Sequence, residues 1–297
     1  MDVYDGDVKV TKLTILCCFK NDERYLSEFF IPMTLVLERI YNISFAYMII
    51  ENNSIDSTRD LLKKFIATKS PDSKLLNFDH VKDYKNIGIG NNYERIHAIM
   101  DVRNTLLKNV ELKSTWSLII DSNIYFKENI INQMFSISPS DLNIGMMTPY
   151  TQQLMIPGIH FTLSPERTDG VKPVLCNHYY DTFSLFVESS RSHYPQCAFE
   201  KCDICKQIRK QTKNKYDTLP KIVKETETIV DCDSCFGGFA FIHNDIFNKY
   251  SITWDTVSYN SEQESLCEHF LFCYQIRKLA KKRVVILQNI DDIYRTT

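Results

Sequence analysis

The sequence predicts an α/β fold with a mostly parallel open sheet and helices on both of its faces. Apolar, β-branched runs of strand length alternate along the first half of the chain with longer segments whose apolar residues recur at helical spacing. Apart from Ser117, the run at 116–120 is apolar, as expected of a strand that is buried on both faces. Such an alternation requires crossover connections, which are right-handed in nearly all parallel sheets.

The elements follow one another in a regular order from residue 12 onward. Strands are predicted at 12–19, 45–50, 75–81 and 116–120, with helices between them at 21–39, 54–67 and 92–110. Beyond about residue 142 the pattern loosens. We expect short strands at 144–149 and 180–187, an ordered apolar segment at 236–242, a helix at 262–278 and a strand at 283–288.

The bulk composition is that of an ordinary soluble globular protein, with 297 residues of which 44% are hydrophobic and 24% charged. The net charge of −2 offers no electrostatic case for nucleic acid or an anionic membrane as the main partner. No apolar stretch approaches the roughly 20 residues of a membrane span. The first seven residues are acidic and lack the apolar core of a signal peptide, so we expect a cytoplasmic protein.

The most informative motif is Asp121-Ser122-Asn123, at the end of the predicted strand 116–120. Ligands of open α/β sheets bind just outside the carboxyl ends of the strands. A carboxylate in that position can hold a hard divalent cation, and the cation can hold a diphosphate. With Asn123 in the motif, the cation would meet one carboxylate and one neutral amide. The alternative is a helix start, with Ser122 or Asn123 capping the segment 127–134.

Polar clusters also close the first two predicted strands. Phe19 and Asn21 stand at the end of the first strand, and Glu51, Asn53 and Asp56 at the end of the second. Because neighbouring parallel strands end at the same edge of the sheet, these residues are expected at the ligand edge. Glu51 or Asp56 could accept hydrogen bonds from a ribose or a base. Helix capping by Asn21, Asp56 and a neighbouring serine is the alternative, and it is compatible with ligand contact.

Two arginines on the predicted helix 92–110 are candidate phosphate ligands. Arg95 and Arg103 are eight residues apart, which places them close to one face of the helix. An arginine near a helix N-terminus that follows a Gly-x-Gly loop suits a phosphate. A solvated helix face or a structural ion pair would explain the same residues.

The C-terminal third contributes two weaker motifs. Gly237 and Gly238 lie between aromatic residues, which indicates that the backbone approaches something closely, either a sugar or the chain itself in a tight turn or bulge. Glu268 and His269 lie next to each other in the predicted helix 262–278. Histidine is a good metal ligand and glutamate can act as a base, whereas the alternative is an exposed helix face.

A cysteine cluster has the spacing of metal ligands. Cys197, Cys202 and Cys205 follow the pattern Cys-x4-Cys-x2-Cys, which is compatible with a structural zinc site. A fourth ligand could come from Cys176, His193, Cys232 or Cys235. Disulfides and free thiols are the alternatives.

In their order along the chain, these segments resemble GT-A glycosyltransferases, and more closely the cryptococcal capsule-type mannosyltransferases and related transferases of large DNA viruses. The residues that carry the resemblance are 20–26, 51–58, Arg95, Arg103-Asn104, 121–126, Tyr180-Asp181, Phe236-Gly237-Gly238 and 267–269. The resemblance implies a single GT-A catalytic domain over 1–297. Its nucleotide-binding half would be 10–125, and its acceptor half 126–297, with a cysteine-bearing insertion at about 190–230.

The resemblance also implies an activity and its partners. The protein would transfer a hexose from a nucleoside diphosphate sugar, UDP-linked rather than GDP-linked, to a hydroxyl of a glycan or glycoprotein. The cofactor would be Mn²⁺ or Mg²⁺. The likeness to viral transferases adds the viral factory of an infected host cell as a place of action.

The same resemblance assigns roles to individual residues. Asp121 and Asn123 would bind the metal that bridges the donor diphosphate, with His269 as the distal ligand. Glu51 and the loop at Phe19 would hold the nucleoside. Because of their positions at the ligand edge or on the predicted helix 92–110, the further candidates for contact with the nucleotide are Asn21, Asn53, Asp56, Arg95, Arg103, Asp121 and Ser122. An inverting reaction would take its carboxylate base from Glu268, Asp181 or Asp233, whereas a retaining reaction needs no such base.

Two other functions remain open. Because Asn123 lowers the negative charge on the metal, the chain could be a catalytically inactive GT-A module that binds a nucleotide or glycan, or acts as a scaffold. A nucleotidyltransferase could have a similar α/β sheet. Such an enzyme would require a loop rich in glycine and basic residues after the first strand, and residues 17–20 are not such a loop. The sequence does not predict an oligomeric state.

Overall fold

The computed structural model describes residues 1–79, 93–155, 174–179, 184, 229–256, 258–260, 264–265, 267–290 and 293–295. Its centre is an eight-stranded sheet with the strand order β11-β15-β8-β12-β6-β3-β4-β5. These strands are β3 (Lys12–Phe19), β4 (Ser44–Glu51), β5 (Lys74–Asn77), β6 (Trp116–Ile120), β8 (Ile144–Pro149), β11 (Ile229–Asp231), β12 (Phe239–His243) and β15 (Arg283–Leu287).

The central sheet is mixed but mostly parallel. Strands β5, β4, β3 and β6 are parallel neighbours, and β15 is parallel to β8. Only β12, which separates β6 from β8, and β11 at the edge run in the opposite direction within this sheet. This arrangement confirms the predicted α/β class. The sheet contains strands from both predicted halves of the chain, 10–125 and 126–297.

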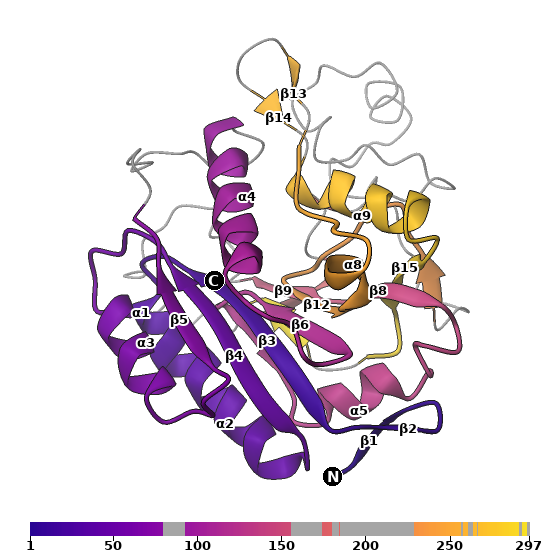
Figure 1. The fold of residues 1–297 in the computed structure, drawn as a ribbon, viewed down its shortest axis with the longest axis horizontal. Helices are drawn as coiled ribbons and strands as arrows, with labels where there is room; N and C mark the ends of the chain where they lie inside the picture. Colours follow the sequence, from indigo (N-terminus) through magenta and orange to yellow (C-terminus); the bar gives the residue numbers. More distant parts are fainter. Residues whose placement is uncertain are drawn as a thin grey trace.

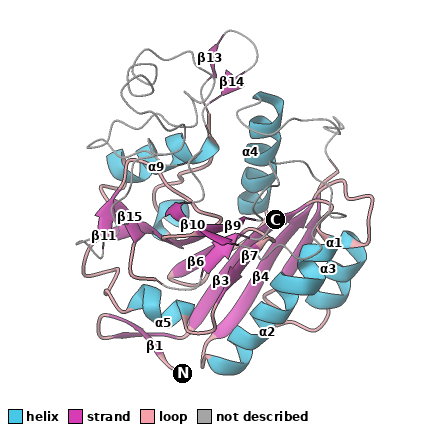
Figure 2. Ribbon diagram, turned by 180° about the vertical axis from the view of Figure 1, so that it is seen from behind, coloured by secondary structure: helices cyan, strands magenta, loops and turns pink. Residues whose placement is uncertain are grey.

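Helices cover both faces of the sheet (Figures 1 and 2). One face carries α1 (Glu23–Tyr25), the π-helix η1 (Leu26–Phe30), α2 (Ile31–Ile40), α3 (Thr58–Ile66) and α5 (Ile130–Phe135), and the other carries α4 (Tyr93–Lys108), α8 (Asp245–Asn248) and α9 (Glu268–Lys278). The alternation of side chains along a strand explains the two cores. Ile15 of β3 packs in the cluster that contains Leu62 of α3, whereas its neighbour Leu16 packs with Val102 of α4 and Phe272 of α9.

Smaller elements surround this centre. A second sheet has the order β10-β9-β16-β7, and two hairpins are formed by β1-β2 and β13-β14. Their bounds are β1 (Val3–Asp5), β2 (Val8–Val10), β7 (Ile124–Phe126), β9 (Gln152–Met155), β10 (Val174–Tyr179), β13 (Ser258–Asn260), β14 (Glu264–Ser265) and β16 (Ile293–Arg295). The buried carboxylate of Asp5 anchors the first hairpin, because it accepts hydrogen bonds from Trp116 Nε1 at 2.9 Å and from the backbone N–H of Ser140 at 2.8 Å.

The predicted boundaries hold where apolar runs are continuous and fail where they are not. The helix predicted at 262–278 begins only at Glu268, because 264–265 forms β14 and pairs with β13. Residues 258–265 are almost wholly polar, so a helix there would bury no apolar face, and the structure instead pairs the strand 258–260 with the strand 264–265. The strand predicted at 180–187 lies outside the described residues, apart from residue 184.

None of the helices in the part of the chain that the structure describes combines the length and the apolar character needed to cross a membrane.

Candidate active site

Asp121 stands at the carboxyl end of β6, in the turn that leads to β7. Its backbone N–H donates to the carbonyl oxygen of Gly238 at 2.8 Å, and its side chain is 38% exposed. Asn123 is half-buried in the same turn. The helix-cap alternative is wrong, because residues 124–126 form a strand that pairs with β16 and α5 starts only at Ile130. The turn therefore presents Asp121 at the ligand edge of the sheet.

The close backbone approach predicted at Gly238 is made by the chain itself. Gly238 has a φ of +70°, and a Cβ added to it would lie 2.7 Å from Ile124 Cδ1 and 3.3 Å from Asp121 Oδ2. A side chain is excluded at this position on both grounds. The tight-turn alternative therefore accounts for this glycine, whose absent side chain lets β12 approach the turn that holds Asp121.

The loops that follow β3 and β4 are bonded to each other. Asn21 donates its backbone N–H to Ser54 Oγ at 3.0 Å, and its side-chain oxygen accepts from the backbone N–H of Ile55 at 2.9 Å. The backbone N–H of Asp22 donates to Thr58 Oγ1 at 2.7 Å. These side chains join two loops rather than capping a single helix.

A further hydrogen bond joins the first loop to the turn after β6. Ser122 Oγ donates to Asp22 Oδ1 at 2.7 Å, and the backbone N–H of Lys20 donates to Asp22 Oδ2 at 2.9 Å. Burial raises the pKa of Asp22, and these two hydrogen bonds only partly offset that rise. The ends of β3, β4 and β6 are thus tied together through what we call the strand-end network, which consists of Asn21, Asp22, Ser54, Thr58 and Ser122. The sequence analysis included Asp22 only as part of the polar segment 20–26 and gave it no role of its own, because nothing distinguishes it from the polar residues beside it.

Glu51, predicted to hold the nucleoside, is fully enclosed. It has no exposed side-chain surface, its Oε1 accepts from the backbone N–H of Ser54 at 2.7 Å, and its Oε2 is ion-paired with Arg59 Nε. Arg59 extends to the surface, where its Nη2 lies 2.5 Å from Asp79 Oδ1. Asn53, in the same turn, has a φ of +53°. The sequence analysis did not single out Arg59, since an arginine in the first turn of a helix has no distinctive pattern.

Two other predicted nucleotide ligands have structural partners. Phe19 is buried and packs edge-to-face on Phe30, with 4.9 Å between the ring centroids. Asp56 Oδ1 accepts from the backbone N–H of Thr58 at 3.0 Å, and its Oδ2 from that of Glu23 at 3.2 Å. Their contact with a nucleotide remains a prediction.

On the opposite side of the turn, a group of charged residues gathers around Arg103. The Arg103 side chain is 11% exposed, and its Nη1 lies 2.7 Å from His269 Nε2 and 3.7 Å from Glu268 Oε1. Its Nη2 lies 4.0 Å from Asp121 Oδ1. We call Arg103, Asp121, Glu268 and His269 the arginine cluster. It joins α4, the start of α9 and the end of β6, which are far apart in the sequence.

Aromatic rings enclose the arginine cluster. The ring of Phe236 stacks on His269 with 3.9 Å between centroids, and Arg103 Cζ lies 4.8 Å from the centroid of Phe236 and 5.5 Å from that of Trp254. Cation–π attraction therefore helps to hold the guanidinium. Asn104 fixes Trp254, because its side chain exchanges hydrogen bonds of 2.8 and 3.0 Å with the Trp254 backbone. Sequence reasoning missed Trp254, although it is one of only two tryptophans.

The charges in the arginine cluster are well defined. Burial, and after it the charge of Arg103, lowers the pKa of His269 well below its usual value, so the imidazole is neutral. Burial alone would lower the pKa of Arg103, but Glu268 and Asp121 more than offset this effect and raise it. A guanidinium has only donors, so the 2.7 Å contact requires that His269 Nε2 carries the lone pair. Trp254 Nε1 also points its N–H at His269 Nδ1 at 3.4 Å; because a neutral imidazole has a single lone pair, the tautomer that accepts the shorter contact from Arg103 leaves this longer contact without an acceptor.

The predicted metal ligands do not form a ready ligand set. The His269 lone pair is directed at Arg103, so this histidine could ligate a cation only after Arg103 had moved. Among the described residues, no three His, Cys, Asp or Glu side chains are arranged to hold a metal. A cation held by Asp121, Asn123 and the phosphates of a donor alone remains a prediction.

The other predicted site residues lie elsewhere. Arg95 is eight residues from Arg103 along α4, a rise of about 12 Å, and its contact with a nucleotide remains a prediction. Asp233 is ion-paired with Arg277 of α9. Cys232 and Cys235 are both buried. Asp181, Cys197, Cys202 and Cys205 are outside the described residues, so a base at Asp181 and the zinc site remain predictions.

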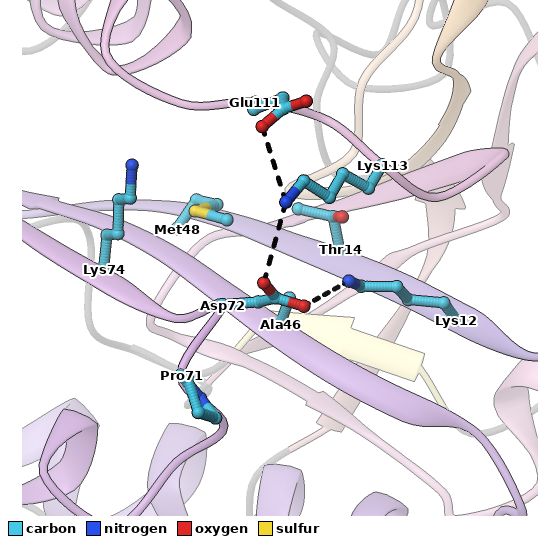
Figure 3. A pocket seen from close by; sticks show the side chains of 9 residues that line it. All are labelled: Lys12, Thr14, Ala46, Met48, Pro71, Asp72, Lys74, Glu111 and Lys113. Carbon is cyan, nitrogen blue, oxygen red and sulfur yellow. Dashed lines mark hydrogen bonds and ion pairs between the residues drawn. The ribbon is translucent and has the colours of Figure 1, made fainter.

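A small pocket at the opposite edge of the sheet is separate from this site (Figure 3). Lys12 lies 2.5 Å and Lys113 3.9 Å from the carboxylate of Asp72, and Lys113 also pairs with Glu111 at 3.5 Å. The pocket lies at the amino end of β3, away from the carboxyl edge where ligands of such sheets bind.

No family model matches the chain, and no curated protein matches it by sequence. Among solved structures, S. aureus TarS 1–349 is similar with a TM-score of 0.48 and 12% identity, over 96% of this chain and 60% of that one. The complex of TarS 1–349 with UDP-GlcNAc has a TM-score of 0.47 and 12% identity, over 97% and 59%.

The mannosyltransferase PcManGT from Pyrobaculum calidifontis, in complex with GDP-Man and Mn²⁺, is similar with a TM-score of 0.39 and 10% identity, over 84% of this chain and 50% of that one. The chain thus spans 60% or less of the length of these three structures. With TM-scores below 0.5, these likenesses do not establish a shared function, so a functional assignment has to rest on the residues of this chain.

Proposed function

We propose that this protein is a glycosyltransferase, which moves a hexose from a nucleoside diphosphate sugar to a hydroxyl group of a glycan or glycoprotein. The observation that carries the proposal is the arginine cluster at the carboxyl edge of the sheet, where Arg103 lies between Asp121 and Glu268. Ligands of open α/β sheets bind at this edge. A permanent cation held in a largely buried position suits the diphosphate that leaves in such a reaction.

The transfer step uses these groups in defined roles. The oxygen of the acceptor hydroxyl attacks the anomeric carbon of the sugar, the bond from that carbon to the diphosphate oxygen breaks, and its electron pair stays on the diphosphate. Arg103 stabilises the negative charge that develops there. In an inverting reaction the hydroxyl proton passes to a carboxylate, for which Glu268 is the candidate beside Arg103. His269 is not placed to ligate a metal in this arrangement, because its lone pair is directed at Arg103.

The donor follows from the resemblance and from the strand-end network. That network lines the edge between β3, β4 and β6, where the nucleoside would lie. The resemblance favours a UDP-linked hexose over a GDP-linked one. A divalent cation at Asp121 and Asn123 is part of the same proposal, and its contribution is tested together with the donor.

The experiment is a panel of nucleotides and nucleotide sugars, measured by thermal shift and by hydrolysis, with and without Mn²⁺. A bound donor should stabilise the protein by about 2–3 kcal/mol at a hundredfold excess over Kd. If no nucleotide shifts the melting curve, the proposal fails and the scaffold function takes its place. Binding without hydrolysis or transfer to any acceptor would identify an inactive nucleotide-binding module, for which Asn123 is the motivating residue.

A further inference from the structure

Two N–H groups point at one neutral imidazole in the arginine cluster. Arg103 Nη1 lies 2.7 Å from His269 Nε2, and Trp254 Nε1 lies 3.4 Å from His269 Nδ1. A neutral imidazole has one lone pair and one N–H, so it can accept only one of these two hydrogen bonds. The shorter contact places the lone pair on Nε2, toward Arg103. The N–H groups of Trp254 Nε1 and His269 Nδ1 then face each other.

This arrangement leaves a buried donor unsatisfied. Trp254 and His269 are each 3% exposed, so solvent has little access to either ring, and the part of the chain that the structure describes offers Trp254 Nε1 no other acceptor. A buried N–H without a partner is costly. The indole is also held in place, because it stacks on Phe272 with 4.6 Å between centroids and 7° between planes, and Asn104 binds its backbone.

The other tautomer of His269 would satisfy every one of these groups except Arg103. Its Nδ1 lone pair would accept from Trp254 Nε1, and its Nε2–H would point at Glu268 Oε1, which lies 3.4 Å away. Because Glu268 is only 4% exposed, a hydrogen bond from the imidazole would stabilise its buried carboxylate. Only Arg103 conflicts with this tautomer, since its N–H at 2.7 Å would then meet a second donor.

A phosphate offers Arg103 a stronger acceptor than the imidazole does. Hydrogen bonds to an ionised acceptor are roughly twice as strong as those between neutral groups. The side chain of Asp121 is 38% exposed, whereas His269 is buried, so a ligand reaches the guanidinium from the Asp121 side. To grip a diphosphate with two parallel N–H groups, Arg103 would turn its terminal nitrogens away from His269.

We propose that His269 and Trp254 are positioning residues, which release Arg103 to an anionic ligand through a change of the His269 tautomer. The inference rests on the proposed function, in which this ligand is the diphosphate of the donor. When Arg103 turns to the phosphate, Nδ1 of His269 loses its proton to water and Nε2 takes one up from water, so the charge of the imidazole does not change. Trp254 Nε1 then donates to Nδ1, and Nε2 donates to Glu268. The hydrogen bond gained at Trp254 offsets the one that Arg103 gives up.

The first test needs no ligand. The chain has two tryptophans, so the ¹⁵N-labelled protein shows two indole N–H signals, and Trp116 serves as internal reference because its Nε1 already donates to Asp5 at 2.9 Å. In Arg103→Met, at about pH 8 where histidine is neutral, the Trp254 signal should move downfield while that of Trp116 stays in place. Histidine-selective labelling, assigned with His269→Gln, should show the His269 proton on Nδ1 in wild type and on Nε2 in Arg103→Met.

The second test adds a ligand to the wild-type chain, where no substitution can disturb the fold. Saturating UDP or inorganic pyrophosphate should move the His269 proton from Nδ1 to Nε2 and shift the Trp254 signal as in Arg103→Met. Trp254→Phe keeps a ring against Phe272 but removes the N–H, so the release of Arg103 loses its compensating hydrogen bond. The affinity for UDP, measured by calorimetry, should fall about two- to tenfold, which corresponds to one hydrogen bond.

Tyr274→Phe is the matched control, since it also removes one polar hydrogen from an aromatic residue, at a position on α9 that is 49% exposed. This variant should keep the wild-type affinity for UDP, and melting temperatures verify the folding of every variant. If UDP binds while His269 keeps its tautomer, or if Trp254→Phe binds UDP as tightly as wild type, the inference is overturned and the proposed function stands. If neither UDP nor pyrophosphate binds, the proposed function fails, and the release of Arg103 fails with it.

Discussion

The strand-end network and the arginine cluster share one edge of the sheet but hold their polar groups in different ways. In the network, Asn21, Asp22 and Ser122 make hydrogen bonds of 2.7–3.0 Å with their neighbours. In the cluster, Arg103 stands 3.7 and 4.0 Å from its two carboxylates, beyond hydrogen-bond length. The network joins its polar groups to one another, whereas the cluster holds its cation by aromatic packing and by one hydrogen bond to the neutral imidazole of His269.

This difference separates scaffold from chemistry. A polar group that is satisfied within the protein loses hydrogen bonds when it turns to a ligand, so the network is suited to fixing the positions of three strand ends. A guanidinium enclosed by Phe236, Trp254 and His269 is positioned without being neutralised by a short ion pair. If Arg103 bound a ligand phosphate, it would therefore give up no short ion pair within the protein. Changes in the cluster should thus affect turnover, and changes in the network should affect stability.

The largest effect is expected from Asp121→Ala, which removes one side of the arginine cluster. Donor turnover should fall by at least about 10²-fold, as is typical when a group that organises transition-state charge is lost. The fold should persist, because the side chain is 38% exposed and the backbone bond to Gly238 remains. Hydrolysis of the nucleotide sugar and the melting temperature measure the two parts. Wild-type turnover in this variant would remove Asp121 from the site, and Asp60→Ala is the control for an exposed carboxylate.

The second effect is on stability, and it compares two Arg–Glu pairs. Arg59→Met leaves the carboxylate of Glu51 buried without its partner and should cost about 2–4 kcal/mol of unfolding free energy, somewhat less than for a fully buried pair because Arg59 is 31% exposed. Arg24→Met breaks an exposed pair with Glu28 and should cost no more than about 0.5 kcal/mol. Urea unfolding measures both. Equal losses would show that Glu51 does not depend on Arg59.

The third effect is a pH dependence that arises in the arginine cluster. The pKa of His269 lies well below 6.5 in the folded state. As the pH falls below 6.5, this histidine therefore becomes protonated in the unfolded chain but stays neutral in the folded protein. The unfolding free energy should therefore fall with decreasing pH, by up to about 1.4 kcal/mol per pH unit. His243 contributes in the same direction, because its pKa is also lowered.

Replacing His269 isolates its share of this slope. His269→Gln should flatten the decline in stability between pH 6.5 and 5 relative to wild type. Unfolding curves in urea at several pH values provide the measurement. An unchanged slope in His269→Gln would mean that the imidazole is not held neutral by its burial beside Arg103.

The smallest effect is expected in the strand-end network. Ser122→Ala removes a single hydrogen bond to Asp22 and should cost about 1 kcal/mol, because the backbone N–H of Lys20 still binds the same carboxylate. Ser136→Ala, which removes an exposed bond to a backbone carbonyl, is the matched control and should cost less. A loss of several kcal/mol in Ser122→Ala would show that the network depends on this one link and is not distributed over its members.

Much of the fold could be predicted because it depends on local patterns. The strands predicted at 12–19, 116–120 and 144–149 have these bounds in the structure, since each is a short run made mostly of apolar residues. Where the local pattern is ambiguous, tertiary pairing decided the outcome. Residues 124–126 form β7 and not the start of a helix, because β16 from the end of the chain pairs with them.

The sequence by itself determined that polar motifs would gather at one edge, because parallel strands in register end together whatever else they contact. Only the tertiary structure decided which of these residues face one another. His269 meets Arg103 across 166 positions because α9 packs against α4, and Glu51 is enclosed rather than exposed because Arg59 of α3 covers it. Whether a segment forms a strand or a helix depends on the spacing of its apolar residues over a short stretch of sequence. A contact between two side chains depends on how whole elements pack, and no local pattern encodes that packing.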